Sequence, residues 1–333
     1  MLDRVTIERL EAAAGDRPIL IALSGGGDSL ALLHLMAERF GAPRLMAAVV
    51  DHGLREGSAA DAAHAREMAV AAGVAAEILT LRWPDGAKRG QSAARNGRYA
   101  ALCDYARRIG APVIATGHTR DDQAETVLLR AARGSFWRGL AAMAPLAPAP
   151  IWPEGRGILL ARPLLGARRT ELRALLKARG ACWLEDPANV NTNFARVRAR
   201  AALEALGSDA MRLAAIAERL APHARALDDA ALALIERAVS FDEDAIAIDP
   251  ATWLGGEEVR ARALSVLLAS AGAAERAPEV GAADFTNALT LAGALVRPSR
   301  RAVRISRDPG ALTGRADGAR PLVSNDHGDG QLR

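Results

Sequence analysis

Between residues 19 and 130, short apolar runs alternate with longer amphipathic stretches, and this alternation limits the folds open to the chain. Each apolar run is continuous and four to six residues long, as in buried parallel strands; the runs are 19–23, 45–50, 77–81 and 113–116. The stretches between them are long enough for helices and end near Gly or Pro; they are 28–40, 58–72 and 92–109. The pattern predicts an α/β fold with a doubly wound parallel sheet.

The pattern changes after residue 143, which suggests how the chain divides into domains. A Pro-rich stretch at 144–157 indicates a surface excursion, after which a strand at 158–161 and a helix at 167–179 continue the alternation. An Ala-rich helical pattern runs from 203 to 238 and precedes a mixture of helices and short strands. We expect a first domain at 1–205, a mainly helical second domain at 206–310 and a disordered tail at 311–333.

Composition excludes several classes of protein. Half of the 333 residues are hydrophobic and a quarter are charged, as in a packed globular protein, and the net charge of +4 permits a polyanionic partner without requiring one. Cys103 and Cys182 are far apart in the sequence, which argues against a disulfide scaffold, a zinc ribbon or a cysteine-held cluster. No leader-like or membrane-length apolar segment is present, so we expect a cytoplasmic protein without membrane contact.

The turn after the first predicted strand has the character of an anion-binding site. It reads SGGGDS and leads directly into a predicted helix, whose first backbone N–H groups can bind phosphate. Glycines allow a phosphate to approach closely, the serines can donate hydrogen bonds, and the aspartate can cap the helix or contact a phosphate-bound Mg²⁺. The predicted nucleotide-binding residues are Ser24, Gly25, Gly26, Gly27, Asp28 and Ser29.

Two common nucleotide-binding signatures do not fit this turn. A Walker loop requires a Gly-Lys pair followed by Ser or Thr, and no lysine lies near. The dinucleotide fingerprint requires glycine where Leu30 stands. The turn alone does not decide whether its ligand is ATP or a simpler anion.

A pair of acidic residues follows the fourth predicted strand. In GHTRDDQAET, Thr119 or Asp121 can cap a helix whose first turn carries Asp122 and Glu125, three residues apart and so on one face. These acids could simply favour the helix dipole, or they could recognise a cation.

His52 and His118 each follow a predicted strand on the edge of the sheet where ligands bind. Either histidine could be a structural hydrogen-bonding residue or a general base. Asp51 and Arg55 flank His52 and could contribute to the same site.

Arginines that could contact phosphate occur in several segments. Arg95 and Arg98 are one turn apart on a predicted helix, and a solvated helix face is the alternative for them. The same alternative applies to the basic run at 297–307. The remaining candidates are Arg133, Arg196, Arg198 and Arg200.

Together these motifs resemble one known family. SGGGDS matches the SGGxDS signature of PP-loop ATP pyrophosphatases. Five blocks between residues 17 and 205 resemble the tRNA(Ile)-lysidine synthase family in order and spacing; they are VDHGLR, SAARNGRYAAL, GHTRDDQAETVLLRAARGS, RPLL and WLEDPANVNTNFARVRAR. The last block departs from the family pattern at Asn191 and Val197.

The resemblance implies an ATP-dependent ligase that joins free L-lysine to C2 of the wobble cytidine of an isoleucine tRNA with a CAU anticodon. It implies Mg²⁺ beside Asp28, lysine recognition by Asp122 and Glu125, and the ability to form a homodimer. It implies adenine or ribose contacts for the loop of His52 and places the segment of Arg95 near ATP and the tRNA end; on this basis Asp28, His52, His118 and Arg95 are the predicted catalytic residues. It implies tRNA or phosphate contacts for Arg98, Arg133, Arg196, Arg198 and Arg200.

Two other functions remain compatible with a PP-loop. One is a tRNA-thiolating enzyme, which normally carries paired cysteines that this chain lacks. The other is a sensor that binds ATP without using it, for which neither the paired acids nor the later arginines would be needed.

Overall fold

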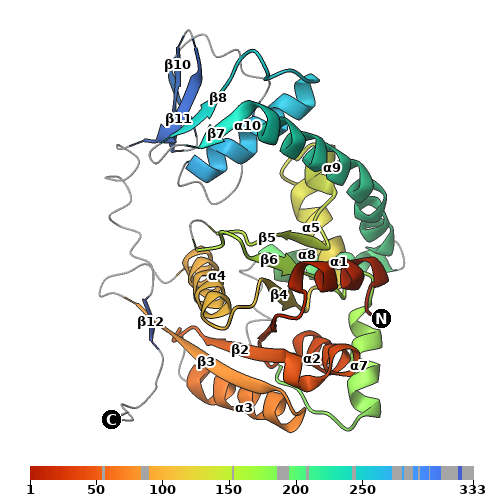
Figure 1. The fold of residues 1–333 in the computed structure, drawn as a ribbon. Coiled ribbons are helices and arrows are strands. Elements are labelled where there is room, and N and C mark those ends of the chain that lie inside the picture. The colour runs from red at the N-terminus through yellow and green to blue at the C-terminus, as the bar shows by residue number, and fades with distance from the viewer. Residues whose placement is uncertain are drawn as a thin grey trace, which may run out of the picture. The chain divides into compact units, whose positions relative to one another are not determined.

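The computed structural model describes two compact units, residues 1–220 with 320–333, and residues 221–319 (Figure 1). Within them the described residues are 1–54, 57–83, 90–151, 154–185, 195–207, 210–241, 245–271, 280, 288–291, 293–299, 301–308 and 322–324. Residues 206–220 group with the first unit in this division, and a domain boundary at 205 stays a prediction.

The first unit is built on a seven-stranded sheet with the order β12-β3-β2-β1-β4-β6-β5. Its five central strands are parallel, which confirms the predicted α/β fold. They are β1 (Ile19–Leu23), β2 (Leu45–Asp51), β3 (Ala75–Arg82), β4 (Val113–Thr116) and β6 (Leu159–Ala161). Ile19 of β1 is paired with Leu45 on one side and with Val113 on the other, so the SGGGDS turn leaves from the centre of the sheet.

Two antiparallel strands lie at the edges of this sheet. β5 (Leu146–Pro148) lies within the Pro-rich stretch predicted to be a surface excursion and pairs with β6. Pro148 is tolerated there because an edge strand does not need every backbone N–H. β12 (Leu322–Ser324) lies within the segment expected to be a tail and pairs with β3.

Helices cover both faces of the sheet, and the alternation of side chains along β1 shows why (Figure 1). Ile19, Ile21 and Leu23 belong to one hydrophobic cluster with side chains of α1, α2, α3 and α7, whereas Leu20 belongs to another with side chains of α4. The helices are α1 (Arg4–Ala14), α2 (Gly27–Phe40), α3 (Ser58–Ala71), α4 (Gln91–Arg108), α5 (Arg120–Ala131), α6 (Trp137–Leu140), α7 (Arg169–Ala178) and α8 (Ala195–Leu206), with a 3-10 turn η1 (Ala42–Arg44). A strand that is apolar on both sides needs this two-faced cover.

The second unit contains a sheet in addition to its helices. Its strands are antiparallel in the order β7-β8-β11-β10-β9. Helix α9 (Ala210–Ala238), which begins in the first unit, leads into it, and α10 (Glu257–Ala271) packs on β10 and β11. The strands are β7 (Val239–Phe241), β8 (Ile246–Ile248), β9 (Leu289–Leu291), β10 (Ala294–Pro298) and β11 (Val303–Arg307). The description of this region as mainly helical was therefore incomplete.

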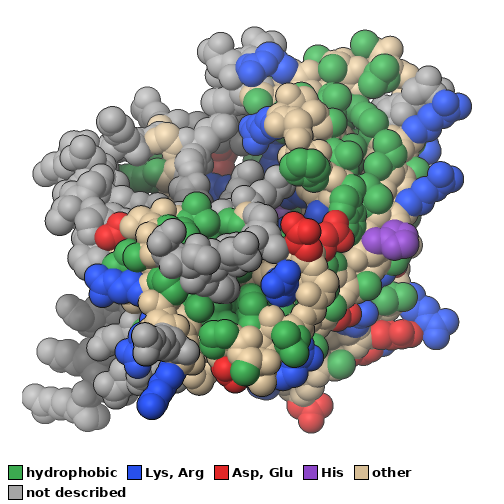
Figure 2. All heavy atoms as spheres, turned by 90° about the horizontal axis from the view of Figure 1, so that it is seen from above, with side chains coloured by type: hydrophobic (Ala, Val, Ile, Leu, Met, Phe, Trp, Pro, Cys, Tyr) green, Lys and Arg blue, Asp and Glu red, His purple; other side chains and the backbone are tan. Residues whose placement is uncertain are grey.

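The basic run at 297–307 spans β10 and β11 of this second sheet. Arg297 and Arg304 are paired across the two strands and are exposed, whereas Val303 and Ile305 are buried. Arg297 and Arg304 therefore lie on the solvent-facing side of the two strands, and contact of the run with phosphate stays a prediction. Figure 2 shows Lys and Arg side chains spread over the face in view rather than gathered in one patch.

Across the described ranges, no helix has both the length and the apolar character needed to cross a bilayer.

Candidate functional site

The SGGGDS turn is held in shape by its own serines. The Ser29 hydroxyl donates to the Gly26 carbonyl at 2.9 Å, accepts from the Ser24 N–H at 3.2 Å and lies 3.0 Å from the Ser24 hydroxyl. Leu30 N–H makes the first backbone hydrogen bond of the α2 ladder, to Gly26. The N–H groups before Leu30 belong to the free end of the helix, which is the arrangement that binds anions.

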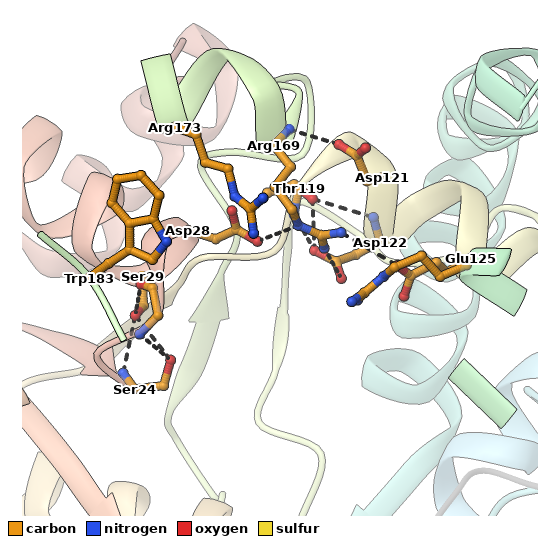
Figure 3. Close-up of polar contacts among 12 residues, drawn as sticks. Ser24, Asp28, Ser29, Thr119, Asp121, Asp122, Glu125, Arg169, Arg173 and Trp183 are labelled. Atoms are coloured by element: carbon orange, nitrogen blue, oxygen red, sulfur yellow. Dashed lines mark hydrogen bonds and ion pairs between the residues drawn. The ribbon is translucent and has the colours of Figure 1, made fainter. Parts of the chain in front are cut away.

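The segment at 183–185 packs against this turn. Leu184 N–H donates to the Gly25 carbonyl at 2.9 Å. Gly25 has φ of +79°, which favours glycine, and a Cβ there would lie 2.7 Å from the Leu184 side chain, which would have to move. The Trp183 ring lies beside Gly27, and its Nε1 donates to Glu185 at 2.8 Å. Figure 3 shows the Trp183 ring on the same side as Asp28 and Ser29. The fold therefore brings the start of the WLED block to the nucleotide-binding turn.

The loop between β4 and α5 contacts the start of α2 through its backbone. A Cβ on Gly117 would lie 2.8 Å from the Asp28 carbonyl oxygen and 2.9 Å from the Ser29 nitrogen. Only glycine allows this approach. GHTRDD and SGGGDS, more than eighty residues apart in the sequence, therefore form one continuous surface.

His118 follows Gly117 and is held by Thr116, whose hydroxyl lies 2.8 Å from its Nδ1. Burial lowers the pKa of His118, and nearby arginines add to this effect against the opposing charge of Asp122. The imidazole is therefore neutral near pH 7 and can accept a proton.

Asp122 takes part in the cap of α5 and also faces an arginine. Thr119 is the N-cap of α5, and its N–H and hydroxyl both donate to Asp122 Oδ2 at 2.8 Å in a capping box. The other oxygen, Oδ1, lies 3.3 Å from a guanidinium nitrogen of Arg169. One carboxylate therefore starts the helix and also faces a cation.

Arg169, the first residue of α7, joins the nucleotide-binding turn to the acid pair (Figure 3). Its Nε donates to Asp28 Oδ2 at 2.9 Å, its Nη2 to Asp122 Oδ1 at 3.3 Å, and its Nη1 lies 3.7 Å from Glu125 Oε1. The side chain is 18% exposed. The sequence analysis missed this residue, because nothing in the local sequence separates it from the neighbouring Arg168.

Glu125 is the most buried acid of the site, with a side chain only 2% exposed. Arg200 Nε donates to its Oε1 at 3.0 Å, while its Oε2 has no hydrogen-bond partner among the described residues. Burial raises the pKa of Glu125, and the charge of Asp122 raises it further, against the opposing effects of Arg200 and Arg169. A buried carboxylate oxygen without a partner marks a place where a cationic group would be stabilised.

Arg169 lies closest to Asp28 and Asp122, and the pKa values of these two acids are shifted in opposite directions. Burial favours the neutral form of Asp122, but Arg169, His118 and Thr119 outweigh it and lower the pKa. Burial raises the pKa of Asp28, and Arg169 offsets only part of that increase. Asp122 thus keeps its charge more firmly than Asp28 does.

The charges of this cluster do not balance. Asp28, Asp122 and Glu125 contribute three negative charges, and in the part of the chain that the structure describes their ion pairs involve two arginines, Arg169 and Arg200. One negative charge is left over when all are ionised. The cluster therefore suits one additional monovalent cation beside an anion-binding turn.

Comparison with known proteins identifies the first unit. The model of the PP-loop domain family matches residues 3–206. The chain belongs to the PP-loop domain family. The match includes SGGGDS, the acid pair, Arg169 and Arg200.

Several relatives carry the name tRNA(Ile)-lysidine synthase. The one from Hyphomonas neptunium is 50% identical over 56% of this chain and 50% of its own length. The relative from Ruegeria pomeroyi is 44% identical over 62% of this chain and 49% of its own length. The relative from Mesorhizobium japonicum is 38% identical over 78% of this chain and 58% of its own length. The chain thus spans about half the length of the first two relatives.

A solved structure shares the fold. The U34-tRNA thiolase NcsA from Methanococcus maripaludis, with its [4Fe-4S] cluster, aligns over 66% of this chain and 78% of its own, with a TM-score of 0.51 and 18% identity. At this identity the likeness concerns the fold alone.

Outside the acid cluster, the PP-loop domain holds a second group of arginines around a buried tyrosine. Arg95 and Arg98 of α4 lie 4.9 and 5.2 Å from the centroid of the Tyr99 ring. Burial favours a high pKa for Tyr99, but Arg98, Arg95 and Arg162 together lower it. The Arg95 and Arg98 side chains are half-buried, so this face of α4 is not fully exposed to solvent.

The three candidate arginines between residues 196 and 200 have different surroundings. Arg196 and Arg198 are exposed on α8, whereas Arg200 points to Glu125. Arg133, after α5, is exposed. Contacts of these residues with phosphate stay predictions.

His52 lies at the end of the neighbouring strand β2. Its carbonyl accepts from Trp83 Nε1 at 2.7 Å, and the preceding Asp51 accepts from Gly53 N–H at 3.0 Å. These contacts shape the loop; a catalytic role for His52 stays a prediction. Arg55, Asn191 and the other residues of 186–194 lie outside the described residues.

Proposed function

We propose that this chain ligates free L-lysine to C2 of the wobble cytidine of an isoleucine tRNA with a CAU anticodon, using ATP. The observation that carries the proposal is the contact of an anion-binding turn with a buried acid cluster that has one unbalanced negative charge. An enzyme that combines ATP with a cationic amino acid needs such a pair of sites. The similarity to relatives named tRNA(Ile)-lysidine synthase supports the identity of the substrates.

The PP-loop is proposed to bind the pyrophosphate part of ATP through Ser24, the three glycines, Asp28 and Ser29. Arg169 contacts only the Oδ2 oxygen of Asp28 within the described part of the chain, so Oδ1 can face a metal-bound phosphate. One carboxylate oxygen together with phosphate oxygens is the ligand set that Mg²⁺ prefers. Bound there, Mg²⁺ would neutralise charge on the phosphates.

In the first half-reaction, the C2 carbonyl oxygen of the cytidine attacks the α-phosphate of ATP and pyrophosphate leaves. The base is then bonded through that oxygen to AMP. Such a displacement depends on neutralisation of phosphate charge, which the helix end of α2 and the arginines of α4 can supply. Arg95 and Arg98 are the proposed residues on α4, where Tyr99 holds both guanidinium groups.

In the second half-reaction, the ε-amine of lysine attacks C2, the C2–O bond breaks and AMP leaves. Asp122 and Glu125 are proposed to hold the lysine as a cation before the reaction. The amine must lose a proton to become a nucleophile, and the neutral His118 lies in the loop directly before α5, whose first turn carries Asp122. His118 is therefore the proposed base, and His52 the alternative.

The tRNA is proposed to contact Arg98, Arg133, Arg196 and Arg198. Arg200 is proposed to contact it as well, while keeping its ion pair with Glu125. We propose that this activity takes place in the cytoplasm. We also propose that two chains associate as a homodimer.

Thiolation is less compatible with the cysteines of this chain. Burial raises the pKa of Cys103 to about 12, against the lowering effect of Arg107, so this thiol does not form the nucleophilic thiolate. Cys182 is exposed. A cluster held by three or four cysteines needs more than the two in this sequence.

The test is incorporation of labelled lysine into an isoleucine tRNA transcript with a CAU anticodon, with ATP present. The expected result is one lysine per tRNA, with AMP and pyrophosphate released only when the tRNA is added. A transcript with uridine at the wobble position is the matched control and should accept no lysine. Sulfur transfer instead of lysine transfer, or pyrophosphate release without tRNA, would contradict the proposal.

A further inference from the structure

Arg169 places its three side-chain nitrogens on three different carboxylates (Figure 3). Nε contacts Asp28 at 2.9 Å, Nη2 contacts Asp122 at 3.3 Å, and Nη1 lies 3.7 Å from Glu125. Asp28 belongs to the nucleotide-binding turn, and the other two acids belong to α5. A planar guanidinium is the one side chain that can hold donors toward three acids in a fixed geometry.

The backbone of Arg169 is fixed as well. Its N–H donates to Asp121 Oδ2 at 2.8 Å, which ties the first residue of α7 to the first turn of α5. Leu172 and Leu176 of α7 are fully buried in the cluster that also contains α2. The fold thus sets where the guanidinium lies, and this position is between the two proposed substrate sites.

We propose that Arg169 is a positioning residue that couples the two half-reactions, because it sets the carboxylates on the ATP side and on the lysine side with one group. The inference rests on the proposed function. Asp28 is oriented by Nε, so its free oxygen faces the nucleotide, and Asp122 and Glu125 are oriented for the lysine. Loss of this group changes both sides at once, which distinguishes Arg169 from a residue that serves one substrate.

The charge count predicts how lysine binding responds. Without Arg169, three carboxylates are left with Arg200 alone, so the cluster attracts a cation at least as strongly as before. The carboxylates are no longer set in one arrangement, so the bound lysine is held less productively. Arg169→Met should therefore slow both half-reactions at least tenfold while the Kd for lysine stays unchanged or falls.

Helix α7 offers a matched control at its other end. Arg179 forms an ion pair with Glu38, in the last turns of α2, so the same two helices are linked a second time away from the acid cluster. Arg179→Met removes an arginine ion pair between the same elements. It should leave both half-reactions within twofold of the unsubstituted chain.

The experiment measures three quantities on the 333-residue chain and on both variants. They are the rate of tRNA-dependent pyrophosphate release, the rate of lysine transfer to pre-adenylated tRNA, and the Kd for lysine by calorimetry. A slowing of both rates in Arg169→Met with retained lysine affinity supports the coupling role. Slowing of one rate alone, weakened lysine binding, or an equal loss in Arg179→Met would overturn it.

Arg169→Lys keeps the inference testable if the Met variant does not fold. Lysine retains the charge but cannot place three fixed donors on three acids. It should fold and still slow both half-reactions several-fold; unchanged rates would overturn the inference. If the unsubstituted chain transfers no lysine, it is the proposed function that fails, and this result is separate from any effect of Arg169.

Discussion

Asp28 and Arg169 are 141 positions apart in the sequence, yet Arg169 Nε lies 2.9 Å from Asp28 Oδ2. The contact joins the nucleotide-binding turn to the start of α7, and the same arginine reaches the acids of α5. Two sites that the sequence presents separately are therefore parts of one charged cluster. The consequences can be tested at single residues on each side of it.

Asp28→Asn should abolish most of the adenylation while leaving the turn intact, because the amide has the shape of the carboxylate without its charge. We expect the rate of tRNA-dependent pyrophosphate release to fall about 100-fold or more, as when a charge-stabilising group is removed from a transfer site. The affinity for lysine, measured by calorimetry, should fall less than in Glu125→Gln, because the substitution removes the unbalanced charge of the cluster while Asp122 and Glu125 remain. Adenylation at the normal rate would show that Asp28 does not serve the nucleotide.

Glu125→Gln should weaken lysine binding without affecting adenylation. The substitution removes the buried charge with its unpartnered oxygen and keeps the shape of the side chain. A hydrogen bond to a charged group contributes about 1.5–3 kcal/mol, so the KM for lysine should rise roughly 10- to 100-fold. A rise in the KM for ATP instead would mean that the two substrate sites have been interchanged.

Asp122→Asn should combine a loss of lysine affinity with a loss of stability, because Asp122 also completes the capping box with Thr119. Loss of a helix cap typically costs about 0.5–2 kcal/mol in the free energy of unfolding. Chemical denaturation measures the stability, and the lysine KM measures the binding. Comparison with Glu125→Gln separates the two effects, since Glu125 does not cap the helix.

Gly117→Ala should disturb the start of α2. The new Cβ would lie 2.8 Å from the Asp28 carbonyl oxygen, closer than real contacts allow. Backbone displacement of this kind costs about 1–3 kcal/mol, and ATP binding should weaken together with stability. Gly166→Ala is the matched control, because a Cβ there meets nothing within 4 Å. Equal melting temperatures for the two variants would contradict the close packing.

As the pH is lowered, lysine affinity should begin to fall at a higher pH than it would if Glu125 had the ordinary pKa of a glutamate. Burial raises the pKa of Glu125 above its usual 4.5, so this side chain takes up a proton as the pH falls toward 4.5 from above. The pKa of Asp122 is lowered, so that acid keeps its charge below its usual 3.8. Calorimetric titration with lysine at decreasing pH should show weaker binding through this window, and Glu125→Gln should remove the dependence.

The raised pKa of Glu125 also fixes the sign of its effect on stability. The folded chain binds this proton more tightly than the unfolded chain, so the Glu125 contribution to the free energy of unfolding decreases as the pH rises through the folded pKa. Asp122 acts in the opposite sense, since its stabilising contribution is lost as the pH falls through its lowered pKa.

Much of the first unit could be predicted because its signals are local. The five parallel strands were each located from a continuous apolar run, and α2, α3, α4 and α7 begin and end within two residues of the predicted helices. Turn chemistry and helix capping are also local, which is why Thr119 could be named as one of two candidate caps of α5. The edge strand β5 was missed because its pairing with β6 depends on the sheet and not on its own Pro-rich sequence.

The missing part of the site depended on contacts distant in sequence. No pattern around Arg169 distinguishes it from Arg168 beside it; only the packing of α7 on α2 places its guanidinium between the acids. Arg200 was grouped with Arg196 and Arg198 by spacing, but helical geometry turns it alone toward Glu125. Such assignments follow from the three-dimensional arrangement of helices.

The contact of Gly117 with the backbone of Asp28 has a consequence for the range of amines that such a site can accept. Because there is no room for a Cβ between Gly117 and the Asp28 backbone, the turn that receives the nucleotide and the loop that leads to the acids are already closely packed. The gap that a substrate amine must bridge is then set by side-chain lengths alone. A variant that accepts a shorter diamino acid must lengthen an acid, as in Asp122→Glu, because the backbone cannot close the gap.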